Sequence, residues 1–282
     1  MIDIELSNPG TTYRATRFDW TGVFERVSFN GREYAGRWFD GDDPLRHDNL
    51  CGMSEEFSPI WLDDRRCLKT GVGILDVPGL QVGYDRFKLY DIADNGVFEV
   101  ENFENGRTTY HIMEGYYNYS KQIHTCGEDS FQIVHKIVNT GKILLQMTCY
   151  NHNFITFGKD CVGRGRKLDF PGRVDGVWRP DSSPKASMQG NGLRFSDFIA
   201  RGEKAFIGNL RYEGCERDGY AFSVREQGDG ILPEMAVEVC CDVPMEYAVF
   251  WTNDRVACVE PYVGMAIAPG NKFEWTINYK LI

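Results

Sequence analysis

Apolar and polar residues alternate along most of the chain, as they do in strands that bury one face and expose the other. In the closing segment every second residue is apolar: Phe273, Trp275, Ile277, Tyr279 and Leu281. By contrast, no window of about 12 residues or more shows the period of an amphipathic helix. The pattern therefore predicts an all-β protein.

Two hairpins are predicted where alternating runs flank an Asn-Gly pair, because this pair favours the tight turns that join antiparallel strands. The first covers residues 23–38 and turns at Asn30-Gly31. The second covers residues 96–112 and also turns at an Asn-Gly pair. These turns indicate an antiparallel arrangement of the strands.

Longer strands are predicted in the second half of the chain. Residues 131–154 contain two of them, and residues 235–253 contain another pair that is interrupted near Pro244. The strands are spread evenly, and no linker or block of charge divides the chain. We therefore expect residues 1–282 to form one large antiparallel β-sandwich domain.

Residues 163–191 depart from this pattern, because they are rich in Gly, Pro, Arg and Ser and show little periodicity. They are predicted to form a long loop. Loops of this length in a compact domain often carry function, although an ordinary surface excursion explains the composition equally well.

The composition narrows the classes of partner. The net charge is -10, so binding to nucleic acid or to an anionic membrane is not expected, since both require a positive surface. No apolar run approaches the roughly 18 residues of a membrane span. Aromatic residues make up 13% of the chain, which suits packing between sheets and also the binding of sugars through their apolar faces.

The nine cysteines are odd in number and contain no C-x-x-C motif, so we expect reduced thiols in a cytoplasmic protein. The N-terminal segment has no signal-peptide pattern. The five histidines and the cysteines show no metal-binding spacing, so no metal site is expected.

The stretch "CYNHNFITF" places His152 between Asn151 and Asn153, two residues after Tyr150. Polar groups clustered at the end of a strand suit a pocket for a polar ligand, although the pattern fits a structural role equally well. His135 differs, because it shares one face with apolar residues and is expected in the core.

In "CVEPY", Glu260 ends an apolar strand and precedes Pro261. Burial there would raise the pKa of the carboxyl group and make it a plausible general base. A glutamate in a surface turn is the alternative, since this residue type is mostly exposed.

Taken together, "YNHNF" and "CVEPY" resemble two motifs of the galactose mutarotase-like family, the aldose 1-epimerases. "LKTGVGIL", "HKIVNTGK" and the closing "APGNKFEWTINY" are similar to family segments as well, so the resemblance extends over about residues 65–282. It implies a large antiparallel β-supersandwich. It also implies an isomerase that needs no cofactor or metal, with His152 as the acid and Glu260 as the base.

Such an enzyme interconverts the α and β anomers of a small sugar by opening its ring. We expect the two catalytic side chains to lie on neighbouring strands, several ångströms apart, with the sugar C1 between them. The loop 163–191 should lie near His152. The residues expected to contact the sugar are Tyr150, Asn151, Asn153, Trp251, Tyr262 and Asp218.

Typical family members also carry a second histidine and an arginine upstream, and no segment here matches those motifs. Arg17, Arg65 and Arg66 are candidates for the arginine. Two alternatives therefore stay open. One is a carbohydrate-binding protein without catalysis. The other is a hexose-phosphate epimerase, which needs converging arginines, for which the loop offers Arg164, Arg166, Arg173 and Arg179.

Overall fold

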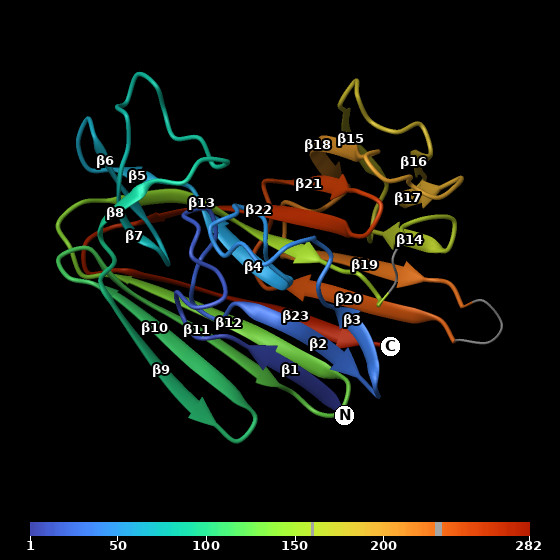
Figure 1. Ribbon diagram of the computed structural model, residues 1–282, viewed down its shortest axis with the longest axis horizontal. Coiled ribbons are helices and arrows are strands. Elements are labelled where there is room, and N and C mark those ends of the chain that lie inside the picture. Colours follow the sequence, from blue (N-terminus) through green and yellow to red (C-terminus); the bar gives the residue numbers. More distant parts are fainter. Residues whose placement is uncertain (159–160, 229–232) are drawn as a thin grey trace.

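A computed structural model describes residues 1–158, 161–228 and 233–282. Within these residues the chain forms 23 strands in four antiparallel sheets and no α-helix (Figure 1), which confirms the predicted all-β sandwich. Accordingly, no helix in the described part is long and apolar enough to cross a membrane.

The largest sheet has ten strands; its long strands lie in the lower part of Figure 1, and its short strands at one edge lie at the upper right. In spatial order they are β16 (Ala186–Gln189), β17 (Gly192–Phe195), β14 (Arg166–Asp169), β19 (Tyr220–Glu226), β20 (Met235–Cys241), β23 (Lys272–Leu281), β12 (Ser130–Asn139), β11 (Tyr117–Thr125), β10 (Gly106–Met113) and β9 (Val97–Phe103).

A sheet of six strands lies above it. Its strands are β15 (Val174–Trp178), β18 (Ala205–Tyr212), β21 (Tyr247–Thr252), β22 (Ala257–Ile267), β13 (Leu145–Phe154) and β4 (Gly52–Phe57). Two small sheets complete the fold: β1 (Ile2–Leu6), β2 (Phe24–Phe29) and β3 (Arg32–Ala35), and β5 (Ile60–Trp61), β6 (Arg66–Lys69), β7 (Gly73–Asp76) and β8 (Asp91–Asp94).

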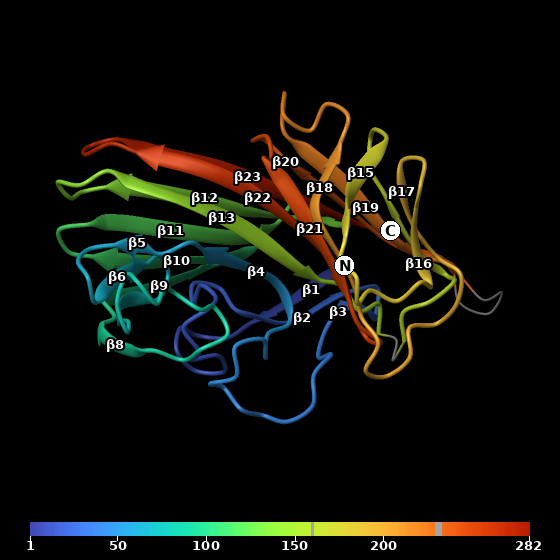
Figure 2. The ribbon, with the colours of Figure 1, turned by 90° about the horizontal axis from the view of Figure 1, so that it is seen from above.

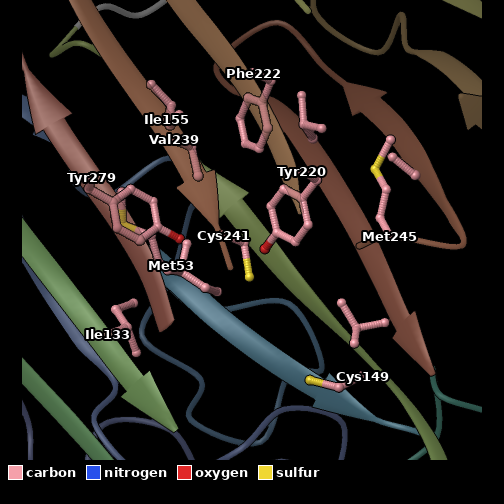
Figure 3. Close-up of a cluster of buried hydrophobic side chains, with 14 of the residues drawn as sticks. Met53, Ile133, Cys149, Ile155, Tyr220, Phe222, Val239, Cys241, Met245 and Tyr279 are labelled. Atoms are coloured by element: carbon pink, nitrogen blue, oxygen red, sulfur yellow. The ribbon is translucent and has the colours of Figure 1, made fainter. Parts of the chain in front are cut away.

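The two large sheets pack face to face, and their long central strands run in nearly the same direction (Figure 2). Figure 3 shows part of the core between them, where Ile133 and Tyr279 of the ten-stranded sheet lie near Met53 of the six-stranded sheet, and Cys149 lies further along the same core. All four side chains are buried. The apolar face that the alternating pattern predicts for these strands is thus the face that packs between the two sheets.

Both predicted hairpins form, as β2–β3 and β9–β10. Asn30 and Gly31 have φ values of 51° and 75°, the left-handed conformation that this tight turn requires. The long strands predicted within 131–154 and 235–253 also form, but their members do not pair. In each case the first strand joins the ten-stranded sheet and the second joins the six-stranded sheet.

The prediction of a long loop over residues 163–191 was wrong, because this segment contains the strands β14, β15 and β16. These strands have only four or five residues each, too few to produce a clear alternation in the sequence. β16 and β15 are edge strands of the two large sheets, and β14 lies two strands in from β16, between β17 and β19.

The central strands of the six-stranded sheet are covered on both faces near one end. The first half of β13 alternates between buried and exposed residues, whereas residues 149–154 are all buried, as is every residue of β4. One face packs on the ten-stranded sheet. The other face is covered by N-terminal segments and by the segment between β7 and β8, and the candidate site lies there.

Candidate active site

His152 and Glu260 meet on the outer face of the six-stranded sheet. In the register of β13 and β22, Tyr150 lies opposite Tyr262. Two residues further along each strand, side chains return to the same face, which brings His152 beside Glu260. The Nε2 atom of His152 is 3.1 Å from Oε1 of Glu260, and the two side chains are only 4% and 7% exposed.

This distance corrects the expectation that a sugar carbon lies between the two groups. At 3.1 Å the imidazole nitrogen and the carboxyl oxygen are in direct contact, with no room for a sugar carbon between them. They form one acid/base pair, and a ligand must approach it from the cavity side. No described side chain hydrogen-bonds to Nδ1 of His152.

Burial keeps this pair uncharged. It lowers the pKa of His152 well below its ordinary value, and the positive charges of Arg17 and Arg86 lower it further. Burial also raises the pKa of Glu260 to about 8, although the same two arginines oppose this shift. At neutral pH these shifts favour a neutral imidazole beside a protonated carboxyl group.

The pair lies at the base of a cavity of about 410 Å³. Its walls come from segments far apart in the sequence: the N-terminal region, the segment between β7 and β8, the end of β15, and strands β18, β21 and β22. Besides the pair, the cavity is lined by Arg17, Trp38, His47, Asp48, Arg86, Phe87, Phe154, Arg179, Phe206, Val249, Trp251 and Tyr262.

Aromatic rings form one end of this cavity. The His152 ring stacks on Phe154, with ring centres 3.8 Å apart, and Trp38 stacks on the same phenylalanine at 5.3 Å. Trp251 approaches His152 edge-on at 6.1 Å. These contacts fix the plane of the imidazole ring, and such rings offer apolar faces of the kind that cover the C–H side of a sugar.

Charged and hydroxyl groups line the other end, and Glu56 holds them from behind the cavity wall. The Glu56 carboxylate accepts a hydrogen bond from Nε of Arg17 at 2.7 Å and another from the Tyr150 hydroxyl, and Lys69 lies 3.4 Å away. Burial raises the pKa of Glu56, but Lys69, Arg17 and Arg86 outweigh it and hold the pKa near about 2. Glu56 is thus ionised and anchors this end.

His47 lines the cavity from the segment between β3 and β4. Its Nδ1 lies 3.4 Å from Nη1 of Arg17, which can only donate. Burial lowers the pKa of His47, so the ring is neutral and its proton is on Nε2. His47 therefore has one nitrogen left as a hydrogen-bond donor.

In the described residues, no group of three or more His, Cys, Asp or Glu side chains is arranged to hold a metal ion. The polar groups of the cavity instead suit a ligand that is held by hydrogen bonds and ring contacts, and that exchanges protons with one acid/base pair.

No protein-family model and no curated protein matches the sequence. Solved structures do match the fold. A galactose mutarotase related enzyme from Lactobacillus acidophilus is 13% identical, with a TM-score of 0.54 over 96% of this chain and 97% of the other. An aldose epimerase homologue from C. elegans is 10% identical, with a TM-score of 0.53 over 93% and 95% of the two chains. The chain has the galactose mutarotase-like fold.

A galactose mutarotase-like protein from Clostridium acetobutylicum shares this fold over 100% of the present chain and 98% of its own, with a TM-score of 0.53 and 10% identity. At such identities the likeness concerns the fold alone. The function must therefore be argued from the residues in the cavity.

Of the residues expected to contact a sugar, Trp251 and Tyr262 line the cavity of this mutarotase-like fold. Tyr150 lies behind its wall, where its hydroxyl group accepts hydrogen bonds from Arg17 at 2.9 Å and Arg86 at 3.3 Å. Tyr150 therefore holds the two arginines in place, and it has no free surface for a ligand.

The prediction that Asn151 and Asn153 contact the sugar is wrong, because their side chains point into the sandwich and away from His152. The Tyr279 hydroxyl lies 2.7 and 2.9 Å from their amide oxygens and can donate its one proton to either. The alternation of β13 requires this outcome, since residues 151 and 153 belong to the face opposite His152. Asp218 is also misplaced, since it is an exposed residue between β18 and β19 and does not line the cavity.

Asn151 also donates to Glu55, at the centre of a buried polar cluster inside the sandwich. His135 belongs to this interior cluster: it is fully buried, as expected, and lies 3.1 Å from Glu55. Lys121 forms an ion pair with Glu55, and it lies 3.7 Å from Asp19. The adjacent residues Glu55 and Glu56 thus point to opposite faces of β4. Glu55 belongs to the interior cluster, and Glu56 binds Arg17 on the side of the cavity.

Most of the arginines proposed for a phosphate lie elsewhere. Arg166 is buried against Glu226 at 2.6 Å, and Arg164 is exposed and near Asp197. Neither Arg164, Arg166 nor Arg173 lines the cavity, and Arg65 and Arg66 do not either. Arg179 does line it, so part of segment 163–191 borders the cavity as predicted.

Proposed function

We propose that the protein is an aldose 1-epimerase that interconverts the α and β anomers of a sugar. The observation that supports this proposal is the buried His152–Glu260 pair, whose polar atoms lie 3.1 Å apart at the base of a cavity lined by aromatic rings and hydrogen-bond donors. The galactose mutarotase-like fold supports it. The nine free thiols also support a cytoplasmic location.

The reaction needs two proton transfers at one carbon. Glu260, as the carboxylate, takes the proton from the hydroxyl group on C1, a C1=O bond forms, and the bond from C1 to the ring oxygen breaks. His152, as the imidazolium, gives a proton to that ring oxygen. Rotation about C1–C2 and the reverse steps then deliver the other anomer.

The resting pair can reach this form without gaining or losing a proton. Moving the shared proton from the carboxyl group of Glu260 to the imidazole of His152 produces the carboxylate and the imidazolium. Arg17 and Arg86 favour the carboxylate, since they lower the pKa of Glu260. They also disfavour the imidazolium. We therefore expect the transfer to be completed only when sugar oxygens replace the contact within the pair.

Anomer exchange measured by NMR magnetisation transfer on a panel of aldoses tests the proposal. Glu260→Gln keeps the shape of the side chain but removes the base, so it should slow exchange by about 10²–10⁴-fold. His152→Gln should act similarly. Glu128→Gln, in the exposed β11–β12 turn, is the matched control and should change nothing. Wild-type rates equal to buffer on every sugar would reject the enzyme.

A carbohydrate-binding protein without catalysis remains the alternative from another class. It is favoured by the absence of a segment that matches the second family histidine. The two readings differ in one measurement. A binding protein is stabilised against heat by its sugar but leaves the exchange rate unchanged, and Glu260→Gln then alters affinity only.

A further inference from the structure

The cavity is polarised along the strands that form its base. Phe154 lies two residues beyond His152 on β13, and Trp251 is paired with Cys258, two residues before Glu260 on β22. This end is aromatic. On the other side of the acid/base pair, Tyr150 and Tyr262 stack with ring centres 4.5 Å apart. The guanidinium group of Arg86 lies against this second row.

The second end carries more positive than negative charge. Glu56 is its ionised carboxylate, and three cations share it: Arg17 at 2.7 Å, Lys69 at 3.4 Å and Arg86 at 3.5 Å. Glu260 adds no negative charge while it is protonated. Asp48 also lines the cavity, but it is paired with Arg46 at 2.9 Å. The protein as a whole carries a net charge of -10, so this local excess of cations is unusual.

Arg86 is the cation with room for a ligand. Its Nη1 donates to the hydroxyl groups of Tyr262 at 3.2 Å and Tyr150 at 3.3 Å. Among the described residues, no hydrogen bond or ion pair occupies Nη2 of Arg86, and the side chain is 38% exposed. Arg17 and Lys69, by contrast, have buried side chains that are already bound.

The spacing fits one sugar ring. Two residues along a strand span roughly 7 Å, so the Tyr150–Tyr262 row lies about that far from the acid/base pair. This is comparable to the distance from C1 of a pyranose to a group carried on C6. A ring with C1 at His152 and Glu260 and its apolar face toward Trp251 would bring such a group to Arg86.

We propose that the cavity takes an aldose with an anionic group remote from C1, a hexuronate or a hexose 6-phosphate, and that Arg86 binds the anion. This proposal rests on the proposed function for the position of C1. The binding of the anion itself follows from the charges and contacts of Arg86. Charge-assisted bonds from a guanidinium group to a carboxylate or phosphate are strong and geometrically selective.

Two measurements test it with glucose, galactose, glucuronate, galacturonate and glucose 6-phosphate. In NMR anomer exchange, kcat/KM for at least one anionic sugar should exceed that for its neutral parent by about tenfold or more. Arg86→Gln should raise KM for that sugar by roughly 10- to 100-fold with kcat little changed. Arg164→Gln, an exposed arginine outside the cavity, is the control. Comparison of the uronates with the phosphate identifies the anion.

Thermal stabilisation by the same sugars gives a readout that does not depend on activity. Stabilisation by an anionic sugar that Arg86→Gln abolishes supports the anion site even if no sugar is epimerised, and in that case only the proposed function fails. Absence of stabilisation by every anionic sugar overturns the anion site. Equal kcat/KM values for neutral and anionic sugars, both reduced alike by Arg86→Gln, overturn it too and leave the epimerase intact.

Discussion

The candidate site combines residues that the sequence marks with residues that it does not. His152 and Glu260 stand out in the sequence because each is a titratable residue in or directly after an apolar or alternating run, although Glu260 lies within β22 and does not end it. Arg17, His47 and Arg86 lie in irregular segments, and only the folded chain brings them to the cavity. The sequence does contain a feature that could have indicated Glu56. In "SEEF" two adjacent glutamates lie in a short strand, so their side chains point to opposite faces and one of them must be on the buried face.

The rate of the wild-type protein should depend on the protonation of Glu260. The mechanism uses the one proton that the resting pair holds, and burial raises the pKa of Glu260 to about 8, so kcat/KM should fall as the pH rises through about 8 and the pair loses this proton. Because the pair is coupled, the midpoint belongs to His152 and Glu260 together. Anomer exchange measured from about pH 6 to about pH 10, roughly two units on either side of this pKa, gives the profile. A flat profile would contradict this role.

At the scale of elements, the alternation predicted which residues form strands better than it predicted how the strands pair. Long strands such as β12, β13 and β23 bury one face over ten residues, so their pattern is plain. The strands of 163–191 are too short to show it. Nor could a local pattern reveal that β12 and β13 lie in different sheets, since that depends on which faces meet across the core.

β11 is tied to β4 across the sandwich by a buried ion pair, because Lys121 lies against Glu55 and near Asp19. Lys121→Met should therefore lower the free energy of unfolding by about 3–5 kcal/mol, since it leaves buried carboxylates without their cation. Lys136→Met on β12 removes an exposed partner of Glu274 and should cost about 1 kcal/mol or less. Urea unfolding measures both. Equal decreases in the free energy of unfolding for the two variants would show that the buried ion pair contributes no more than the exposed one.

Over the whole molecule, the sandwich encloses one polar network and carries another on its outer face. Glu55 belongs to the first and Glu56 to the second, and β4 connects them. Burying charge in this way is costly unless every partner is present. We infer that the interior network fixes the position of β4 and of the N-terminal segment that carries Arg17. The cavity thus depends on packing well beyond its own lining.

These networks give the stability a pH dependence on both sides. Glu55 and Glu56 have folded pKa values of about 2, below the ordinary 4.5. Their contribution is present above that value and is lost as the pH falls toward 2. Glu260 has the opposite sign, because its folded pKa is raised to about 8. Its contribution is complete below 4.5 and declines as the pH rises to 8, by up to about 1.4 kcal/mol per pH unit.

Glu260→Gln separates these terms. The amide does not titrate, so the variant should keep the loss of stability in acid but show a weaker decline between pH 5 and 8 than the wild type, about the range in which Glu260 releases its proton on unfolding. Asp19, whose pKa burial raises to about 7, continues to contribute a decline in both proteins. Urea unfolding at several pH values measures the difference. Parallel curves for the two proteins would mean that Glu260 is already ionised in the folded state, and that the His152–Glu260 pair rests as an ion pair.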